Sequence, residues 1–214
     1  MIKIKNKTFS HYSAFLILLL TILGCSKFET PTKQEYRKDD LTFAHFSNWK
    51  ITEDNITTEA VGNVRFISIE GPSDSILMAT RFPVEVVTTL EEYADYIQKG
   101  MSQEAKDLTG GVEIVKMGEA KTTSSETQIA GALRHGLRRE FDIKVLGVPV
   151  PHRAEYYLIE NNEEKWFIVV QSPKEDWDGL QVGFKTILDS ISIKPATAKE
   201  SEKLISPPPV HKKK

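Results

Sequence analysis

The sequence predicts an α+β domain in which an antiparallel sheet is covered by helices. Two patterns support this prediction. Several segments alternate apolar and polar residues with the period of two that is typical of half-buried strands. Two other segments place apolar residues at helical spacing behind residues that favour a helix start. The order is strands, a helix, a three-stranded meander, a helix and a closing strand, which is typical of a layered α+β domain.

The first 24 residues are typical of a bacterial export signal. They carry three lysines near the start, an apolar run over residues 14–23 and a small residue, Gly24, directly before Cys25. The run is too short for a membrane span, which needs about 20 apolar residues. Cys25 is the only cysteine of the chain. Its position favours lipidation over an ordinary secretory signal in which the cysteine is incidental.

The residues Ile22-Leu23-Gly24-Cys25 resemble the lipobox of bacterial lipoproteins. The resemblance implies that a diacylglyceryl group is attached to the sulfur of Cys25 and that residues 1–24 are removed. Ser26 follows, where an aspartate retains some lipoproteins in the inner membrane, so inner and outer membrane both stay open. The expected location is the cell envelope, with the protein lipid-anchored to a membrane and facing the periplasm or the exterior.

Two polar segments flank the predicted domain, which spans residues 41–194. Residues 25–40 are expected to form a flexible tether. Residues 195–214 contain Pro207-Pro208-Pro209 and end in three lysines, and we expect a disordered tail there. A solvated tail is the preferred interpretation, and contact of its lysines with anionic surfaces is the alternative.

The charge of the chain without its signal is acidic. Residues 1–24 carry three lysines and no acids, so 25 of the 28 basic residues remain beside 30 acidic ones, a net charge of −5. An acidic domain of this kind is unlike the basic proteins that bind nucleic acid. No nucleic-acid partner is therefore expected.

The first half of the domain is expected to hold a hairpin and a helix. Val64–Glu70 and Ile76–Phe82 flank a Gly-Pro-Ser-Asp turn. The helix begins with a capping box, in which the hydroxyl of Thr89 and the carboxylate of Glu92 each reach a free amide. Its buried face is marked by Leu90, Tyr93, Ala94, Ile97, Met101, Ala105 and Leu108. Gly110-Gly111 is expected to end it.

The second half is expected to begin with a short strand at Val112–Met117 and to continue as a meander. In residues 133–145 the odd positions are mostly apolar and the even ones almost all charged, which predicts a half-buried strand. The next strands are expected at residues 151–160 and 165–171. The last is nearly all apolar, as in a strand covered on both faces.

A second helix is expected after the meander, with Ser172 as its cap and Pro173 at its first position. Its buried stripe consists of Trp177, Leu180, Phe184, Ile187 and Leu188. Residues 190–193 are expected to form a short closing strand.

Several core residues of this layout occur in a known pattern. They are Phe43, Phe46 and Trp49-Lys50-Ile51 in an early strand, Leu90–Tyr93 at the helix start, Tyr156-Tyr157-Leu158 and Trp166–Val170 in paired strands, and Phe184–Ile191 at the end. The pattern resembles the PsbP-like fold, which includes the DcrB group of bacterial lipoproteins and a eukaryotic Ran-binding import factor. It covers about residues 41–194, although Asn48 stands where a proline is common. The resemblance implies a non-enzymatic accessory, scaffold or binding domain, and it names no ligand.

No catalytic, metal or cofactor site is predicted. His135 and His152 are placed on neighbouring strands, but no Cys, Asp or Glu stands beside them at ligand spacing. A satisfied core or rim histidine is therefore the preferred interpretation for His135. No Gly-x-Ser-x-Gly elbow frames a serine, and no phosphate loop follows a strand. We expect no enzyme.

Three further features are candidate binding groups. The locally basic region consists of Arg134, Arg138, Arg139, Lys144 and Arg153. For this region a solvated face with cross-strand pairs is preferred over an anion site. Trp49, Trp166 and Trp177 are candidate exposed anchors, with core packing preferred for Trp177. The polar residues 121–128 are interpreted as a hairpin connection rather than a ligand loop.

The predicted function is that of a membrane-anchored envelope lipoprotein that acts as a non-catalytic binding or accessory module for an envelope protein. The alternative is a small-ligand-binding or envelope-stress lipoprotein that holds its ligand in a pocket beside the sheet.

Overall fold

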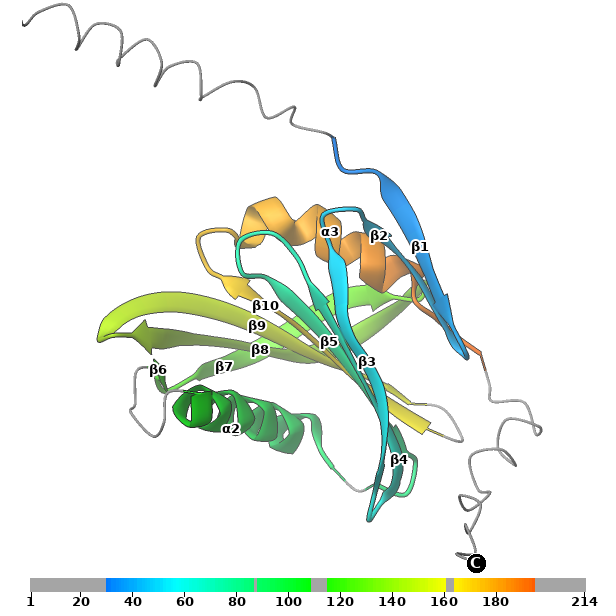
Figure 1. The fold of residues 1–214 in the computed structure, drawn as a ribbon, viewed down its shortest axis with the longest axis horizontal. Helices are drawn as coiled ribbons and strands as arrows, with labels where there is room; N and C mark the ends of the chain where they lie inside the picture. Colours follow the sequence, from blue (N-terminus) through cyan, green and yellow to red (C-terminus); the bar gives the residue numbers. More distant parts are fainter. Residues whose placement is uncertain (1–29, 87, 109–114, 161–163, 195–214) are drawn as a thin grey trace, which may run out of the picture. The chain divides into compact units, whose positions relative to one another are not determined.

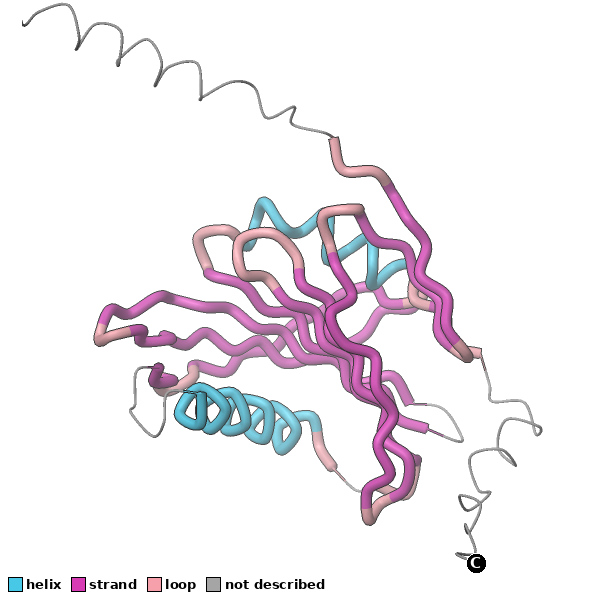
Figure 2. The backbone as a smooth tube through the Cα atoms, in the orientation of Figure 1, coloured by secondary structure: helices cyan, strands magenta, loops and turns pink. Residues whose placement is uncertain are grey.

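The computed structural model describes residues 30–86, 88–108, 115–160 and 164–194 (Figures 1 and 2). The chain divides into two units, Met1–Pro31 and Thr32–Lys214, and the second holds every element described below. Its strands are β1 (Lys33–Lys38), β2 (Leu41–Phe46), β3 (Lys50–Glu59), β4 (Gly62–Glu70), β5 (Ile76–Pro83), β6 (Val115–Met117), β7 (Lys121–Ile129), β8 (Ala132–Val145), β9 (Val148–Glu160), β10 (Glu164–Pro173) and β11 (Ser192–Ile193). Its helices are α2 (Leu90–Leu108) and α3 (Trp177–Ser190).

A large antiparallel sheet lies at the centre of this unit, with the strand order β3-β4-β5-β10-β9-β8-β6. β7 also pairs with β8, so β6 and β7 follow one another along the same edge. β3 forms the opposite edge. The hairpin β4–β5 and the meander β8-β9-β10 confirm the strand pairs predicted from the sequence.

The two faces of the large sheet are covered by different layers (Figure 2). One face packs against α3 and a small sheet of β1, β2 and β11, and the other packs against α2. Along β10, Trp166, Ile168 and Val170 belong to the α3 core, whereas Phe167 and Val169 belong to the α2 core. β10 is thus buried on both faces, as its nearly continuous apolar sequence predicted. The predicted α+β class is confirmed.

Part of the predicted tether is a strand. Residues 33–38 form β1 and pair with β2 in register from Lys33 opposite Phe46 to Lys38 opposite Leu41. The ring of Tyr36 stacks on Phe43 with centroids 4.8 Å apart. Its hydroxyl donates a hydrogen bond to Asp54 of β3. The prediction of a flexible tether over residues 25–40 is therefore wrong for residues 33–38.

A buried ion-pair cluster joins this small sheet to the large one. The side chain of Arg65, on β4, is fully buried. Its Nη1 lies 2.6 Å from Asp40, between β1 and β2, and its Nε and Nη2 each lie 2.9 Å from Asp54. Arg81 of β5 bonds the second oxygen of Asp40 at 2.8 Å, and Lys38 lies 3.0 Å from Asp54. Ion pairs thus connect the small sheet to β3, β4 and β5 of the large sheet.

The start of α3 differs from the prediction. Ser172 and Pro173 continue β10 and lie opposite Arg153 and His152 of β9. The helix begins at Trp177 with Asp176 as its N-cap residue, and no side chain caps it. Ser172 as a helix cap is therefore wrong, because strand pairing extends through it. Pro173 is the last residue of β10.

The remaining sequence predictions concern residues 121–128, the strand at 112–117, Gly110-Gly111 and the tail at 195–214. Residues 121–128, interpreted as a hairpin connection, belong to β7 and pair with β8 along their length. The predicted strand at 112–117 is confirmed over Val115–Met117. Gly110-Gly111, residues 112–114 and the predicted tail at 195–214 lie outside the described residues.

Candidate functional site

An open cleft lies on the α2 face of the large sheet. α2 lies closest to β6, β8 and β9. Arg139 of β8 fixes it there, with its Nη2 2.7 Å from Asp95 and its Nη1 2.7 Å from Oε1 of Gln98. Because the helix lies over this half of the sheet, the same face of β4 and β5 forms the floor of the cleft. We call it the α2 cleft.

The α2 cleft has a volume of about 910 Å³. It is built from the β3–β4 hairpin, β5, Thr88 and the first half of α2. The lining residues are Thr57, Glu59, Ala60, Val61, Val64, Phe66, Met78, Thr80, Phe82, Thr88, Glu92, Tyr93, Tyr96, Ile97, Gly100 and Met101. Most are apolar or aromatic, which is typical of a binding cleft.

The polar groups at the base of the cleft are already paired. The hydroxyls of Thr80 and Tyr93 lie 2.8 Å apart. Burial raises the pKa of Tyr93, so this phenol is neutral at ordinary pH. At the helix start, Glu92 accepts a hydrogen bond from the amide of Thr89 at 2.9 Å and its own amide donates to the Thr89 hydroxyl at 3.1 Å. This confirms the predicted capping box.

The rim combines exposed apolar groups with negative charge. The exposed fractions of Val61 and Tyr96 are 51% and 69%. Among the described residues of the lining, Glu59 and Glu92 are charged, and none is a lysine, arginine or histidine. The arrangement suits an apolar or aromatic group on a neutral or cationic molecule. Among its described lining residues, no nucleophile is paired with a base.

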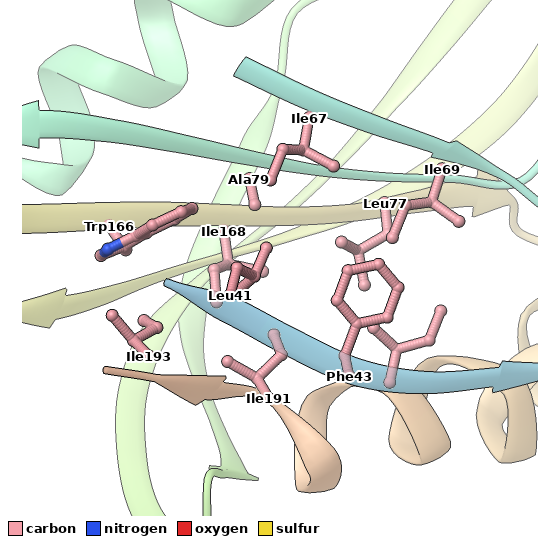
Figure 3. Close-up of a pocket in the computed structure, with 11 residues that line it drawn as sticks. Leu41, Phe43, Ile67, Ile69, Leu77, Ala79, Trp166, Ile168, Ile191 and Ile193 are labelled. Carbon is pink, nitrogen blue, oxygen red and sulfur yellow. The ribbon is translucent and has the colours of Figure 1, made fainter. Parts of the chain in front are cut away.

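A minute cavity lies between the α3 face of the large sheet and the layer that covers it (Figure 3). Its volume is about 10 Å³, and Leu41, Phe43, Trp166, Ile168 and other apolar side chains line it. A space of this size accommodates about one water, which needs polar partners that these side chains do not supply. The α2 cleft, on the other face, is far larger. The alternative of a small ligand held in a pocket beside the sheet stays a prediction.

The structure separates His135 from His152. His152 pairs with Phe141 in the β8–β9 register, six positions from His135 along β8, which corresponds to about 20 Å. His135 is exposed and its Nδ1 lies 2.9 Å from Glu126. His152 is buried, and its Nδ1 lies 2.9 Å from the carbonyl oxygen of Val150. His135 is thus an exposed residue whose ring contacts a carboxylate.

Two of the five residues of the basic region, Arg138 and Arg153, pair with one buried carboxylate, Glu155. Arg139 instead contacts α2. Oε1 of Glu155 lies 2.9 Å from Nε of Arg138 and 2.5 Å from Nη2 of Arg153. Its Oε2 accepts a hydrogen bond of 2.5 Å from Tyr157, whose hydroxyl is 2.8 Å from Ser125. Burial acts to raise the pKa of Glu155, but these hydrogen bonds outweigh it and lower the pKa. The predicted cross-strand pairs are confirmed, although their centre is buried rather than solvated.

The three tryptophans are core residues. Trp49, Trp166 and Trp177 are each at most 3% exposed. A Cβ atom placed on Gly71 or Gly183 would come within 2.8 Å or 2.5 Å of the Trp49 ring, so these glycines make room for it. The interpretation of Trp49 and Trp166 as exposed anchors is wrong, and core packing of Trp177 is confirmed.

Cys25, the predicted lipidation site, lies outside the described residues. Within the described ranges, α2 and α3 are too short or too polar to cross a bilayer as helices. The same ranges contain no group of three or more His, Cys, Asp or Glu residues placed to hold a metal ion.

Comparison with known proteins gives a likeness of fold. No protein-family model matches the chain, and no curated protein sequence matches it either. Among solved structures, the PsbP protein of Synechocystis sp. PCC 6803 (CyanoP) aligns with a TM-score of 0.44 and 14% identity, over 79% of this chain and 96% of that one.

Two further structures show a weaker likeness. LpqN, a protein involved in cell envelope biogenesis in Mycobacterium tuberculosis, aligns with a TM-score of 0.34 and 9% identity over 79% of this chain and 87% of LpqN. A Pseudomonas aeruginosa protein of unknown function aligns with a TM-score of 0.30 and 12% identity over 83% of this chain and 99% of that one. These likenesses concern the fold alone.

Proposed function

We propose that this chain is a lipid-anchored protein of the bacterial cell envelope whose folded domain binds a partner through the α2 cleft, without catalysing a reaction. The observation that carries the proposal is the cleft itself, about 910 Å³ in volume and lined mainly by apolar and aromatic side chains. A hollow of this kind with few polar groups is the usual place for a ligand or a partner segment.

The chemistry of the cleft defines what it binds. Tyr96 and Val61 leave large apolar surfaces in contact with water, and covering them releases that water. An exposed tyrosine of this kind is a frequent anchor in interfaces. Glu59 and Glu92 disfavour an anionic group at the rim. The occupant is therefore an apolar or aromatic segment that carries no charge or a positive one.

The anchor rests on the sequence at Cys25. Two or more acyl chains hold a protein firmly at a membrane, since each buried methylene contributes about 0.8 kcal/mol. The substitution Cys25→Ala is expected to move the protein from the membrane fraction of its own cells to the soluble fraction. A variant that stays in the membrane fraction would refute the lipid anchor at Cys25, and it would not affect the proposal that the α2 cleft binds a partner.

The cleft is tested by a substitution that fills it. Gly100 lies on α2 in the cleft lining, and a Cβ there meets no atom within 4 Å. Gly100→Trp therefore fills the cleft without a clash in the backbone. Gly179→Trp is the matched control, because Gly179 lies on α3, is exposed and has the same free space.

The measurement is cross-linking and pull-down of the full-length protein from its own membranes. We expect a partner that the native chain and Gly179→Trp retain and Gly100→Trp loses. A partner retained by all three would show that binding takes place elsewhere and would overturn the role of the cleft.

The small-ligand alternative is tested on the same three proteins. Organic extraction and mass spectrometry of each purified protein would detect a bound molecule. A molecule present in the native chain and in Gly179→Trp, but absent from Gly100→Trp, would favour the small ligand over a protein partner.

A further inference from the structure

The last described residue, Lys194, lies on the side of β4 opposite to the α2 cleft. The amide of Lys194, directly after β11, donates a hydrogen bond of 2.8 Å to the carbonyl oxygen of Asp40. The carboxylate of Asp40 bonds the Arg65 side chain of β4. Val64 and Phe66, the neighbours of Arg65, line the α2 cleft from the opposite face of the same strand. The chain thus leaves the domain behind the floor of the cleft.

A segment that follows Lys194 can reach the α2 cleft by passing around the edge of the large sheet. β3 is the edge strand beside β4. Neighbouring strands lie about 4.8 Å apart and packed layers about 10 Å apart, so a path from the small sheet around β3 to the cleft measures roughly 25 Å. The ten residues from 195 to 204 span up to about 33 Å when extended. The length of the chain is therefore sufficient.

The sequence beyond this point has the chemistry that the cleft suits. Residues 204–210 read Leu-Ile-Ser-Pro-Pro-Pro-Val, and Lys212, Lys213 and Lys214 follow. Consecutive prolines favour the polyproline II conformation, which loses little entropy on binding and docks in aromatic-lined grooves. The lysines match the negative rim formed by Glu59 and Glu92, an attraction that acts within about 10 Å at ordinary ionic strength.

We propose that residues 204–214 of this chain occupy the α2 cleft, with the proline segment against its aromatic side chains and the lysines at its acidic rim. The inference rests on the proposed function in that both use the same cleft. A segment tethered by ten residues acts at an effective concentration in the millimolar range, so weak contacts suffice to fill the site. An external partner then binds by displacing the tail.

Disulfide trapping tests the placement directly. In the full chain with Cys25→Ala, the only thiols are those introduced. The test pair is Tyr96→Cys, in the cleft, with Val210→Cys, in the tail. The control pair is Val182→Cys with the same Val210→Cys, because Val182 is similarly exposed, at 66%, but lies on α3. The rate of disulfide formation in mild oxidant is measured by mass spectrometry.

We expect the test pair to form an intramolecular disulfide about tenfold faster than the control pair, since docking raises the effective concentration of the tail thiol at the cleft. Replacing Lys212, Lys213 and Lys214 with glutamate should remove most of this difference. Equal rates for both pairs would overturn the proposal. Disulfides formed only between two chains would assign the cleft to the tail of a second copy and overturn occupation by the same chain.

The outcome is separable from that of the proposed function. A trapped disulfide without any partner in the pull-down would support the tail in the cleft and remove the external partner. A partner lost in Gly100→Trp without a trapped disulfide would do the reverse.

Discussion

Replacement of Arg65 by methionine tests how the small sheet is held on the large one. The substitution keeps a long unbranched side chain and removes the charge. Asp40 and Asp54, which are 6% and 8% exposed at their side chains, then lose a guanidinium at 2.6 Å and 2.9 Å. Asp40 keeps Arg81, whereas Asp54 keeps only Lys38 and the Tyr36 hydroxyl.

The expected cost follows from this loss of pairing. Removing one partner of a buried ion pair typically lowers the free energy of unfolding by about 3–5 kcal/mol, because the remaining charge stays buried. That is a large share of the roughly 5–15 kcal/mol that stabilises a typical domain. Arg37→Met is the control, because Arg37 and its partner Glu35 are 69% and 62% exposed, and such a pair contributes less than about 1 kcal/mol.

The same substitution also changes the dependence of stability on pH. Burial acts to raise the pKa of Asp54, but hydrogen bonds from Arg65, Tyr36 and Lys38 outweigh it and lower the pKa from 3.8 to about 2. A lowered pKa in the folded state contributes stability above about pH 4 that is lost as the pH falls toward 2. Arg65→Met should therefore unfold at a higher pH on the acid side.

Urea unfolding followed by circular dichroism, at neutral pH and through the acid range, measures both effects. A loss below about 1 kcal/mol, together with an unchanged acid transition, would refute the reasoning. It would show that the apolar contacts of the small sheet hold the layer without the ion pairs.

Three further predictions concern single residues. Gly136→Ala places a Cβ 2.3 Å from the carbonyl oxygen of Tyr156, so unfolding in urea should show a loss of about 3 kcal/mol, whereas Gly179→Ala, in open space, should gain about 0.5–1 kcal/mol. Leu146 is 77% exposed and has a φ of +51°, a conformation that asparagine adopts more readily. Leu146→Asn should therefore raise the free energy of unfolding by about 0.5–1 kcal/mol and raise the thermal midpoint. An unchanged midpoint would contradict this. Burial raises the pKa of both Tyr36 and Tyr156 to about 12. The stability that their neutral phenols contribute below pH 10 should therefore disappear between pH 10 and 12, and tyrosinate absorbance with a single midpoint near pH 10 for all tyrosines would count against this.

The elements that the sequence predicted correctly are those with a local pattern. The capping box at Thr89 and Glu92 is complete within four residues. In the meander, apolar and polar residues alternate with a period of two, which matches an extended strand. β1 has no such pattern, since Tyr36 is its only residue with partial burial. Pairing with β2 and the contacts of Tyr36 with Phe43 and Asp54 hold it in place, and both depend on residues outside β1. β7 likewise reads as a polar loop, because only Ser125 and Ile129 are buried.

The parts that escaped prediction depend on contacts between distant residues. The strand conformation of Ser172 is imposed by β9, which overrides a sequence suited to start a helix. Trp49 fits only because Gly183, far along the chain, leaves room for its ring. The α2 cleft exists because Arg139 fixes the helix over β8, and no local pattern shows on which part of a sheet a helix lies.

The early start of β1 sets how far the domain can move from a membrane. Lys33, where pairing with β2 begins, lies eight residue steps after Cys25. Fully extended, they span at most about 28 Å, and as a flexible coil they average about 16 Å. A lipid on Cys25 would therefore confine the domain to a thin layer above the bilayer surface. Its encounters would be lateral, with neighbours that diffuse in or on the same membrane, and molecules deeper in the surrounding compartment would have to come to it.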